Sequence, residues 1–178
     1  MRLLAAYGAI IFAALVIQTT AFNFTFGSPL WPDLTLIIAI HGGLRHGMSG
    51  GVRLGAAAGL AEDLLSYGAT GANTLTKGLT GFIVGKLRES YINDSNMARG
   101  VLAVGATVAD HIVYSLVIRT FSDYSALSGS LGALVVAIMM NLAFIFPALR
   151  MINRTVEWAG NLWKDDFGGH SKPWGAGL

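Results

Sequence analysis

Two long stretches of the chain contain no charged residue. The first lies between Arg2 and Asp33, with its apolar part over residues 3–22, and the second lies between Asp123 and Arg150. Each exceeds the roughly 18 consecutive uncharged residues that indicate a transmembrane helix. The pattern therefore predicts a membrane-spanning helix near each end of the chain.

The limits of these two helices are less sharply marked. The second is expected to end near Phe146 and Pro147. A cleaved signal peptide is the alternative for the first, but Arg2 is the only positive charge ahead of it and no A-x-A-like site closes it. A retained helix is the prediction.

The middle of the chain is apolar but interrupted, and it predicts four further helices over residues 32–44, 49–65, 71–87 and 98–119. At 1.5 Å per residue the first two are about 20 and 25 Å long, short for a hydrocarbon core of about 30 Å. A re-entrant hairpin over residues 32–65 is the alternative. It would place the charges around residues 45–53 at mid-membrane depth, at about 2.5–3.5 kcal/mol each. Two short spans are therefore favoured.

The predicted architecture is an all-α, polytopic bundle of about six transmembrane helices. It forms one integral membrane domain over residues 1–164, and residues 165–178 are expected to be a mobile cytoplasmic tail because they lack apolar periodicity.

The positions of the basic residues orient this bundle. With a cytoplasmic N-terminus, ten of the 12 Lys and Arg residues fall on the inside and only Lys77 and Arg119 fall outside. The inside set is Arg2, Arg45, Arg53, Lys86, Arg88, Arg99, Arg150, Arg154, Lys164 and Lys172. This is the bias that membrane insertion produces. Both termini are predicted to be cytoplasmic, in a multi-pass protein of the cytoplasmic membrane.

Composition narrows the classes of function. Apolar residues make up 53% of the chain and charged residues 12%, well away from a soluble enzyme or a nucleic-acid-binding arm. The absence of Cys excludes a disulfide framework, an iron–sulfur site and a cysteine nucleophile. The four His residues have no metal-ligand spacing, and no nucleotide-binding or hydrolase motif occurs. No cofactor, metal or nucleic acid is expected, and a non-enzyme is favoured. In the alternative of an enzyme, Asp33 and Asp63 could serve as its carboxylates.

A ladder of small residues is the clearest regularity. Glycines follow one another at four-residue spacing and lead to an acid: Gly43, Gly47, Gly51, Gly55, Gly59 and then Asp63. Small residues at this spacing let helix backbones approach closely in a membrane. We expect packing within the bundle, and a groove for a partner's transmembrane helix is the alternative.

Polar residues gather at the predicted outer ends of two helices. Asp63 ends one helix, Gly71 lies in the following turn, and Asn73 and Lys77 are in the first turns of the next helix. An Asp63–Lys77 pair with Asn73 beside it would fix this helix hairpin. The alternative is a polar contact site facing the outside of the cell.

Asp110 and His111 are the ionisable pair expected to lie deepest in the membrane. An intramembrane carboxylate indicates a functional site unless it is paired locally. Lys77, Arg119 or a backbone carbonyl could pair with it. A proton relay is the alternative, although the further acidic residues that a pump needs at this depth are missing.

One region resembles a known family. The matching residues are Pro32-Asp33-Leu34, Gly43-Leu44-Arg45-His46-Gly47, Gly51, Gly55, Gly59-Leu60, Asp63-Leu64-Leu65, Gly68, Gly71, Asn73-x-Leu75, Gly81 and Gly85. In this order and spacing they resemble the rod shape-determining MreD family over about a third of the chain. Size and six-span pattern agree over most of the rest, whereas Glu62 and the Gly-rich tail depart from the family pattern.

The resemblance implies a non-catalytic inner-membrane component of the bacterial cell-elongation (rod) complex, which directs peptidoglycan synthesis. Its implied partners are the single-span scaffold MreC and, through it, MreB, RodA and the penicillin-binding partner of RodA, together with membrane lipid. The implied fold is similar to the substrate-binding components of energy-coupling vitamin transporters. Such a transporter component is the alternative function, with Trp31, Tyr114, Tyr124 and Asn141 as candidate pocket residues.

Overall fold

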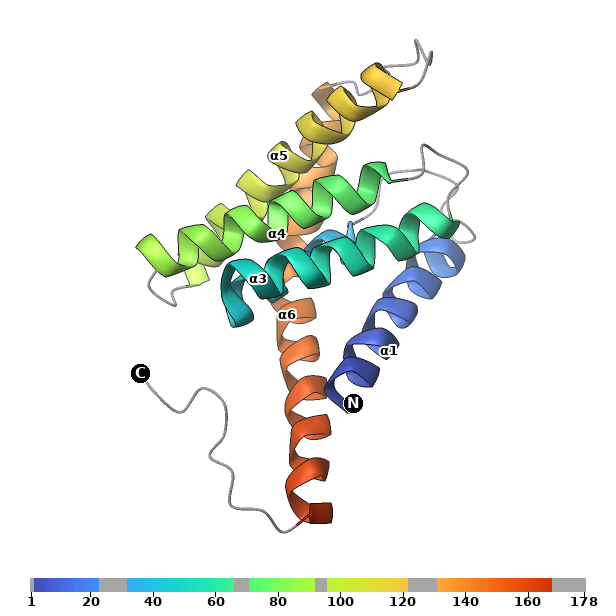
Figure 1. The fold of residues 1–178 in the computed structure, drawn as a ribbon. Coiled ribbons are helices and arrows are strands. Elements are labelled where there is room, and N and C mark those ends of the chain that lie inside the picture. The colour runs from blue at the N-terminus through green and yellow to red at the C-terminus, as the bar shows by residue number, and fades with distance from the viewer. Residues whose placement is uncertain (1, 23–31, 66–70, 92–95, 122–130, 168–178) are drawn as a thin grey trace.

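The computed structural model describes residues 2–22, 32–65, 71–91, 96–121 and 131–167, and its regular elements there are all helices (Figure 1). They are α1 (Arg2–Val16), a π-helical continuation η1 (Ile17–Phe22), α3 (Leu34–Leu65), α4 (Ala72–Tyr91), α5 (Asn96–Phe121) and α6 (Leu131–Phe167). The predicted all-α class is confirmed. The expected tail lies almost wholly beyond the described residues.

α3 is a hairpin of two helices that meet at Gly47. The backbone of Gly47 has φ 68° and ψ −163°, a left-handed conformation that glycine adopts without a steric penalty. The Oε1 atom of Glu89 in α4 accepts the backbone N–H of Met48, 3.2 Å away, and so satisfies a donor at the start of the second half. The predicted interruption between residues 44 and 49 is this turn.

The second half of α3 packs along α4 with the backbones almost touching. A Cβ atom added to Gly51, Gly55 or Gly59 would lie less than 3.0 Å from the backbone of Gly81, Lys77 or Asn73, respectively. Each four-residue step along α3 is thus matched by a four-residue step back along α4. Gly51, Gly55 and Gly59 of the glycine ladder therefore pack against α4 within the bundle, as the packing interpretation predicts, and α4 covers this face of α3.

The first half of α3 forms the centre of the molecule. Its residues 35–43 are all buried, and Leu36, Ile37, Ile38 and Ile40 are at most 1% exposed. Apolar side chains of α1, α5 and α6 pack around it, with Ile145 of α6 fully buried. A short helix that is apolar on all sides requires such complete cover.

Three helices in the described part are long and apolar enough to cross a membrane: Leu3–Thr20 in α1 and η1, Met97–Val117 in α5 and Leu134–Asn161 in α6. The remaining three of the six predicted spans stay predictions, as does the likeness to vitamin transporters. The expected end near Pro147 is wrong, because α6 continues through this proline to Phe167. Long apolar helices tolerate an internal proline when neighbouring groups satisfy the freed backbone.

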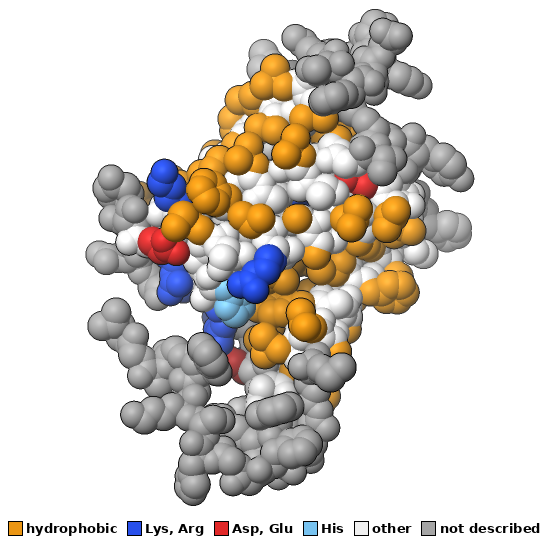
Figure 2. Space-filling view, viewed as in Figure 1, with side chains coloured by type: hydrophobic (Ala, Val, Ile, Leu, Met, Phe, Trp, Pro, Cys, Tyr) orange, Lys and Arg blue, Asp and Glu red, His pale blue; other side chains and the backbone are white. Residues whose placement is uncertain are grey.

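The surface matches a membrane protein. Large apolar side chains are exposed along α1, α4, α5 and α6, and Figure 2 shows them spread over the visible face. Basic side chains in the same view gather toward one side of that apolar surface. Arg45, Arg53 and Arg88, all predicted to be cytoplasmic, lie near enough to His46 to influence its charge. The turn of α3 and the end of α4 therefore share one basic face.

Candidate functional site

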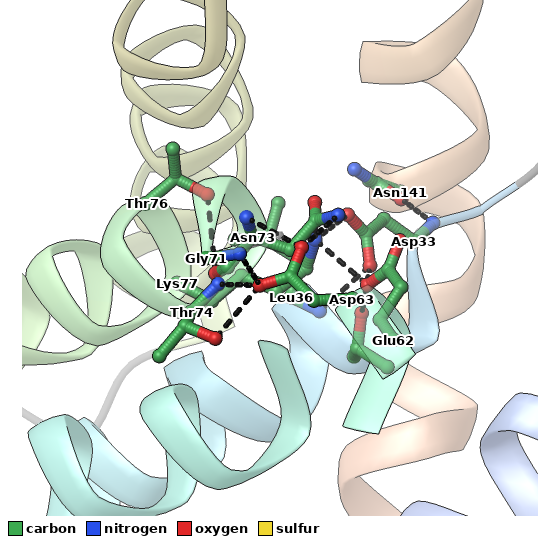
Figure 3. A network of polar contacts seen from close by, with 11 residues as sticks. Asp33, Leu36, Glu62, Asp63, Gly71, Asn73, Thr74, Thr76, Lys77 and Asn141 are labelled. Carbon is green, nitrogen blue, oxygen red and sulfur yellow. Dashed lines mark hydrogen bonds and ion pairs between the residues drawn. The ribbon is translucent and has the colours of Figure 1, made fainter. Parts of the chain in front are cut away.

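A polar network inside the bundle joins α3, α4 and α6, and Figure 3 shows it from close by. Its starting point is Asp33, directly before α3. The Oδ1 atom of Asp33 accepts the backbone N–H of Leu36 at 2.8 Å, as a helix N-cap does. The backbone N–H of Asp33 donates to Oδ1 of Asn141 in α6 at 2.7 Å. Asp33 thereby fixes where the central helix begins and holds it against α6.

Lys77 of α4 is the cation of this network and is 1% exposed. Its Nζ atom lies 3.1 Å from Oδ2 of Asp33, 2.9 Å from Oε2 of Glu62 and 3.0 Å from Oδ1 of Asn73. Three acceptors match the three N–H donors of an ammonium group. A buried charge is tolerable only when it is paired and hydrogen-bonded in this way.

Thr35 links the two carboxylates. Its Oγ1 atom lies 2.6 Å from Oδ1 of Asp33 and 2.6 Å from Oε2 of Glu62. A hydroxyl carries one proton and can donate fully to only one of these oxygens. A proton on one of the two carboxyl groups lets Thr35 accept from that group and donate to the other. The arrangement therefore suits one anionic and one neutral carboxyl group beside Lys77.

Asp63 has a different task from its neighbour Glu62. Its carboxylate accepts the backbone N–H groups of Gly71, Asn73 and Thr74 at 3.0, 3.1 and 2.9 Å, and also the Asn73 amide and the Thr74 hydroxyl. These donors belong to the otherwise unsatisfied first turn of α4. Gly71 has φ 100°, so the turn requires glycine there. Asp63 closes the α3–α4 connection.

The prediction that Asp63 is the acid paired with Lys77 is therefore wrong. In the described part of the chain the Lys77 ammonium lies against Asp33 and Glu62, whereas Asp63 binds the start of α4. Asn73 is the bonding neighbour of Lys77, as predicted. No spacing in the sequence connects Asp33 to Lys77, because the contact depends on how the α3 hairpin folds back.

Asp110 of α5 lies close to the network. Lys77 and Thr76 both lie close enough to act on its charge. Its Oδ1 atom is buried and has no hydrogen-bond partner among the described residues. Asp110 therefore interacts with Lys77 electrostatically, which is one of the pairings that the sequence allowed. His111, next to Asp110 in the chain, is half-exposed and has no hydrogen bond to the described network. One ammonium group faces three carboxyl groups, from Asp33, Glu62 and Asp110.

A second polar cluster connects α1 to the α3 hairpin, and sequence reasoning missed it. The Tyr7 hydroxyl lies 2.7 Å from Nε2 of His46 and 3.2 Å from Nε2 of His41. Burial lowers the pKa of His46, and the charges of Arg45, Arg53 and Arg88 lower it further. A tyrosine hydroxyl can donate to one imidazole and accept from the other. Three single polar residues in apolar helices carry no spacing signal that would have revealed the cluster.

Asn141, a candidate pocket residue, is held within the bundle. Its Nδ2 atom donates to Oγ1 of Thr107 at 2.9 Å, and its oxygen accepts from Asp33. Trp31 and Tyr124 lie outside the described residues. No group of three or more His, Asp and Glu residues in the described ranges could hold a metal ion. The chemistry of the described network is helix capping and charge pairing.

Residues 2–152 match the model of a family described as rod shape-determining protein MreD. The chain belongs to the MreD family. It matches no curated protein and no solved structure. The MreD match covers α1, α3, α4, α5 and the first half of α6, far more than the segment on which the resemblance was seen. MreD proteins are shape-determining membrane components and not a known enzyme family, which agrees with the three apolar helices and with the structural use of Asp33 and Asp63.

Proposed function

We propose that this MreD family member is a non-catalytic adaptor of the bacterial cell-elongation machinery in the inner, or cytoplasmic, membrane. It holds the scaffold MreC and, through it, helps MreB, RodA and the penicillin-binding partner of RodA to direct wall synthesis and maintain rod shape. The observation that carries the proposal is the family match over residues 2–152.

The uses of the polar side chains support an adaptor rather than an enzyme. Asp33 and Asp63 each accept backbone N–H groups at a helix start, and Lys77 is fully enclosed by acceptors. A nucleophile–base set in a cavity would leave such groups accessible to a substrate. Here they hold helices in place, so a partner is recognised by the shape of the bundle.

The partner is expected to contact outward helix faces. Gly51, Gly55 and Gly59 are covered by α4, which removes the ladder as a groove for a partner's helix. Exposed apolar side chains on α1, α5 and α6 remain available to a transmembrane helix. Helix association in lipid depends on close packing of such faces.

The test is replacement of the resident MreD in a rod-shaped bacterium by the tagged protein, followed by crosslinking, solubilisation and affinity purification. We expect restored rod shape and recovery of a single-span scaffold with wall synthases. The variant Gly55→Leu should lose both, and Gly78→Ala should keep both, because a Cβ at Gly78 meets only ordinary contacts at 3.6 Å or more. Recovery of a transport ATPase and a coupling subunit, without rod shape, would overturn the proposal in favour of the transporter.

A further inference from the structure

A basic cavity of about 560 Å³ lies where the start of α5 meets α6. Three arginines converge on it: Arg99 from the first turns of α5, and Arg150 and Arg154 from α6 after Pro147. The two α6 arginines are four residues apart and so share one face of the helix. Guanidinium groups from two different helices therefore line a single hollow.

The residues that line this cavity carry more positive than negative charge. Glu157 is the acidic residue of its lining, and the Oε1 atom of Glu157 also lies 3.7 Å from Nη2 of Arg45, a fourth arginine. The positive end of the α5 helix dipole lies on the same side as Arg99. The lining is thus cationic, and the planar fork of arginine suits the oxygens of a phosphate group.

The other lining residues are apolar except for Asn153. Phe146 and Leu149 of α6 line the cavity beside the arginines. A Cβ atom added to Gly100 of α5 would lie 4.0 Å from the Phe146 ring, so α5 passes close to this wall. A soluble phosphate compound gains nothing from such walls, whereas a phospholipid has both a charged headgroup and acyl chains. Basic pockets between helices near the cytoplasmic face are typical headgroup sites.

We propose that this cavity binds the phosphate of an anionic phospholipid, with the arginines around the headgroup and the acyl chains along Phe146 and Leu149. The charge pattern that orients the helices places Arg99, Arg150 and Arg154 on the cytoplasmic side, where anionic lipid attracts basic residues. The site would fasten the start of α5 to α6 through the lipid.

The test uses the full-length protein in nanodiscs of phosphatidylcholine, with or without phosphatidylglycerol, and native mass spectrometry to count retained phosphatidylglycerol. The double variant Arg150→Gln/Arg154→Gln is compared with Arg53→Gln/Lys86→Gln, which removes two exposed basic residues outside the cavity. We expect retention to fall about tenfold or more in the cavity variant only, since each basic residue contributes on the order of a few-fold in affinity.

Two outcomes overturn the proposal. Equal losses in both double variants would mean a diffuse attraction of basic residues to the membrane. Displacement of the lipid by glycerol phosphate at comparable concentration would mean a site for soluble phosphate compounds. If the double variant does not fold, Arg99→Gln tests the same cavity from α5, and unchanged retention in that folded variant would equally contradict a lipid site.

Discussion

Lys77 shows most directly how a single side chain constrains this bundle. Its ammonium group is 1% exposed, and two of its acceptors, Asp33 and Glu62, come from opposite ends of the α3 hairpin. One residue of α4 therefore ties together the beginning and the end of α3. Removal of this cation leaves the partly buried carboxyl groups of Asp33 and Glu62 without their partner, which costs more than the pair itself contributes.

The first prediction follows for Lys77. Replacing it in Lys77→Met should lower the free energy of unfolding by about 3–5 kcal/mol, the usual cost of breaking a buried ion pair. The matched control is Lys86→Met in the same helix, where the side chain is exposed and the change should stay within about 0.5 kcal/mol. Thermal or denaturant unfolding in detergent measures both. Equal stability of the two variants would show that the network does not hold α3.

The second prediction concerns the proton at Thr35. Asp33 lies at a helix N-terminus, where an anion is stabilised, and Glu62 lies in the last turn of α3, where it is not. Glu62 is therefore the carboxyl group expected to be neutral, so Glu62→Gln should keep the fold and its stability. Asp33→Asn should cost clearly more because it removes the charge opposite Lys77. Infrared spectroscopy checks the assignment: the protonated-carboxyl band should decrease in Glu62→Gln. An unchanged band would contradict it.

At this scale the sequence predicted which residues are important better than it predicted their contacts. Asn73 was correctly placed beside Lys77, and Asp63 was correctly placed at the connection to α4. The partnership of Lys77 with Asp33, 44 residues earlier, depends on the hairpin geometry of α3. Nothing in the adjacent letters Glu62 and Asp63 separates an ion-pair acid from a helix-capping acid.

The elements α3 and α4 depend on each other through backbone contact. The third prediction is that Gly55→Ala destabilises the protein by about 1–3 kcal/mol or more, because the added methyl group would overlap the backbone carbonyl of Lys77. Gly78→Ala, in the same helix pair, should be neutral or slightly stabilising, since its Cβ has room. Unfolding of the two variants under the same conditions measures the difference, and similar stabilities would exclude close packing of α3 on α4.

The contact between α1 and the turn of α3 is expected to respond to pH. The pKa of His46 lies below its ordinary value, so the unfolded chain binds its proton more readily than the folded protein does. The contribution of a neutral His46 should therefore be lost as pH falls below about 6.5. The fourth prediction is a lower unfolding midpoint at acidic pH, with a smaller dependence in His46→Gln. Identical pH profiles would contradict it.

The positions of the helices could largely be predicted from the sequence. Apolar stretches and the charges between them predicted the helices that the described residues form, and the break before residue 49 coincides with the turn at Gly47. The predicted end near Phe146 and Pro147 is wrong, because α6 continues for 20 residues beyond Pro147 to Phe167. Proline ends helices in water more reliably than in an apolar bundle, where packing maintains the remaining backbone bonds.

At the scale of the whole molecule, the membrane topology depends on whether the buried first half of α3 crosses the membrane. Three helices meet the length and hydropathy of a membrane span, and α3 and α4 do not, yet the interior that they form is among the most buried parts of the protein. Short, enclosed helices need not satisfy a hydropathy rule that was derived for lipid-exposed ones. The charge pattern still predicts that both halves of α3 cross the membrane.

The absence of cysteine makes this last prediction simple to test. Single cysteines at Ser49, in the exposed turn region of α3, and at Ser66, after α3, should differ in their reaction with an impermeant maleimide added to intact cells. Six spans place Ser66→Cys outside, where it is labelled at once, and Ser49→Cys inside, where it is labelled only after the membrane is opened. A re-entrant hairpin would instead leave Ser49→Cys unreactive under both conditions, since its charged turn would be enclosed at mid-membrane depth. Labelling of Ser49→Cys in intact cells would reverse the predicted orientation of α3.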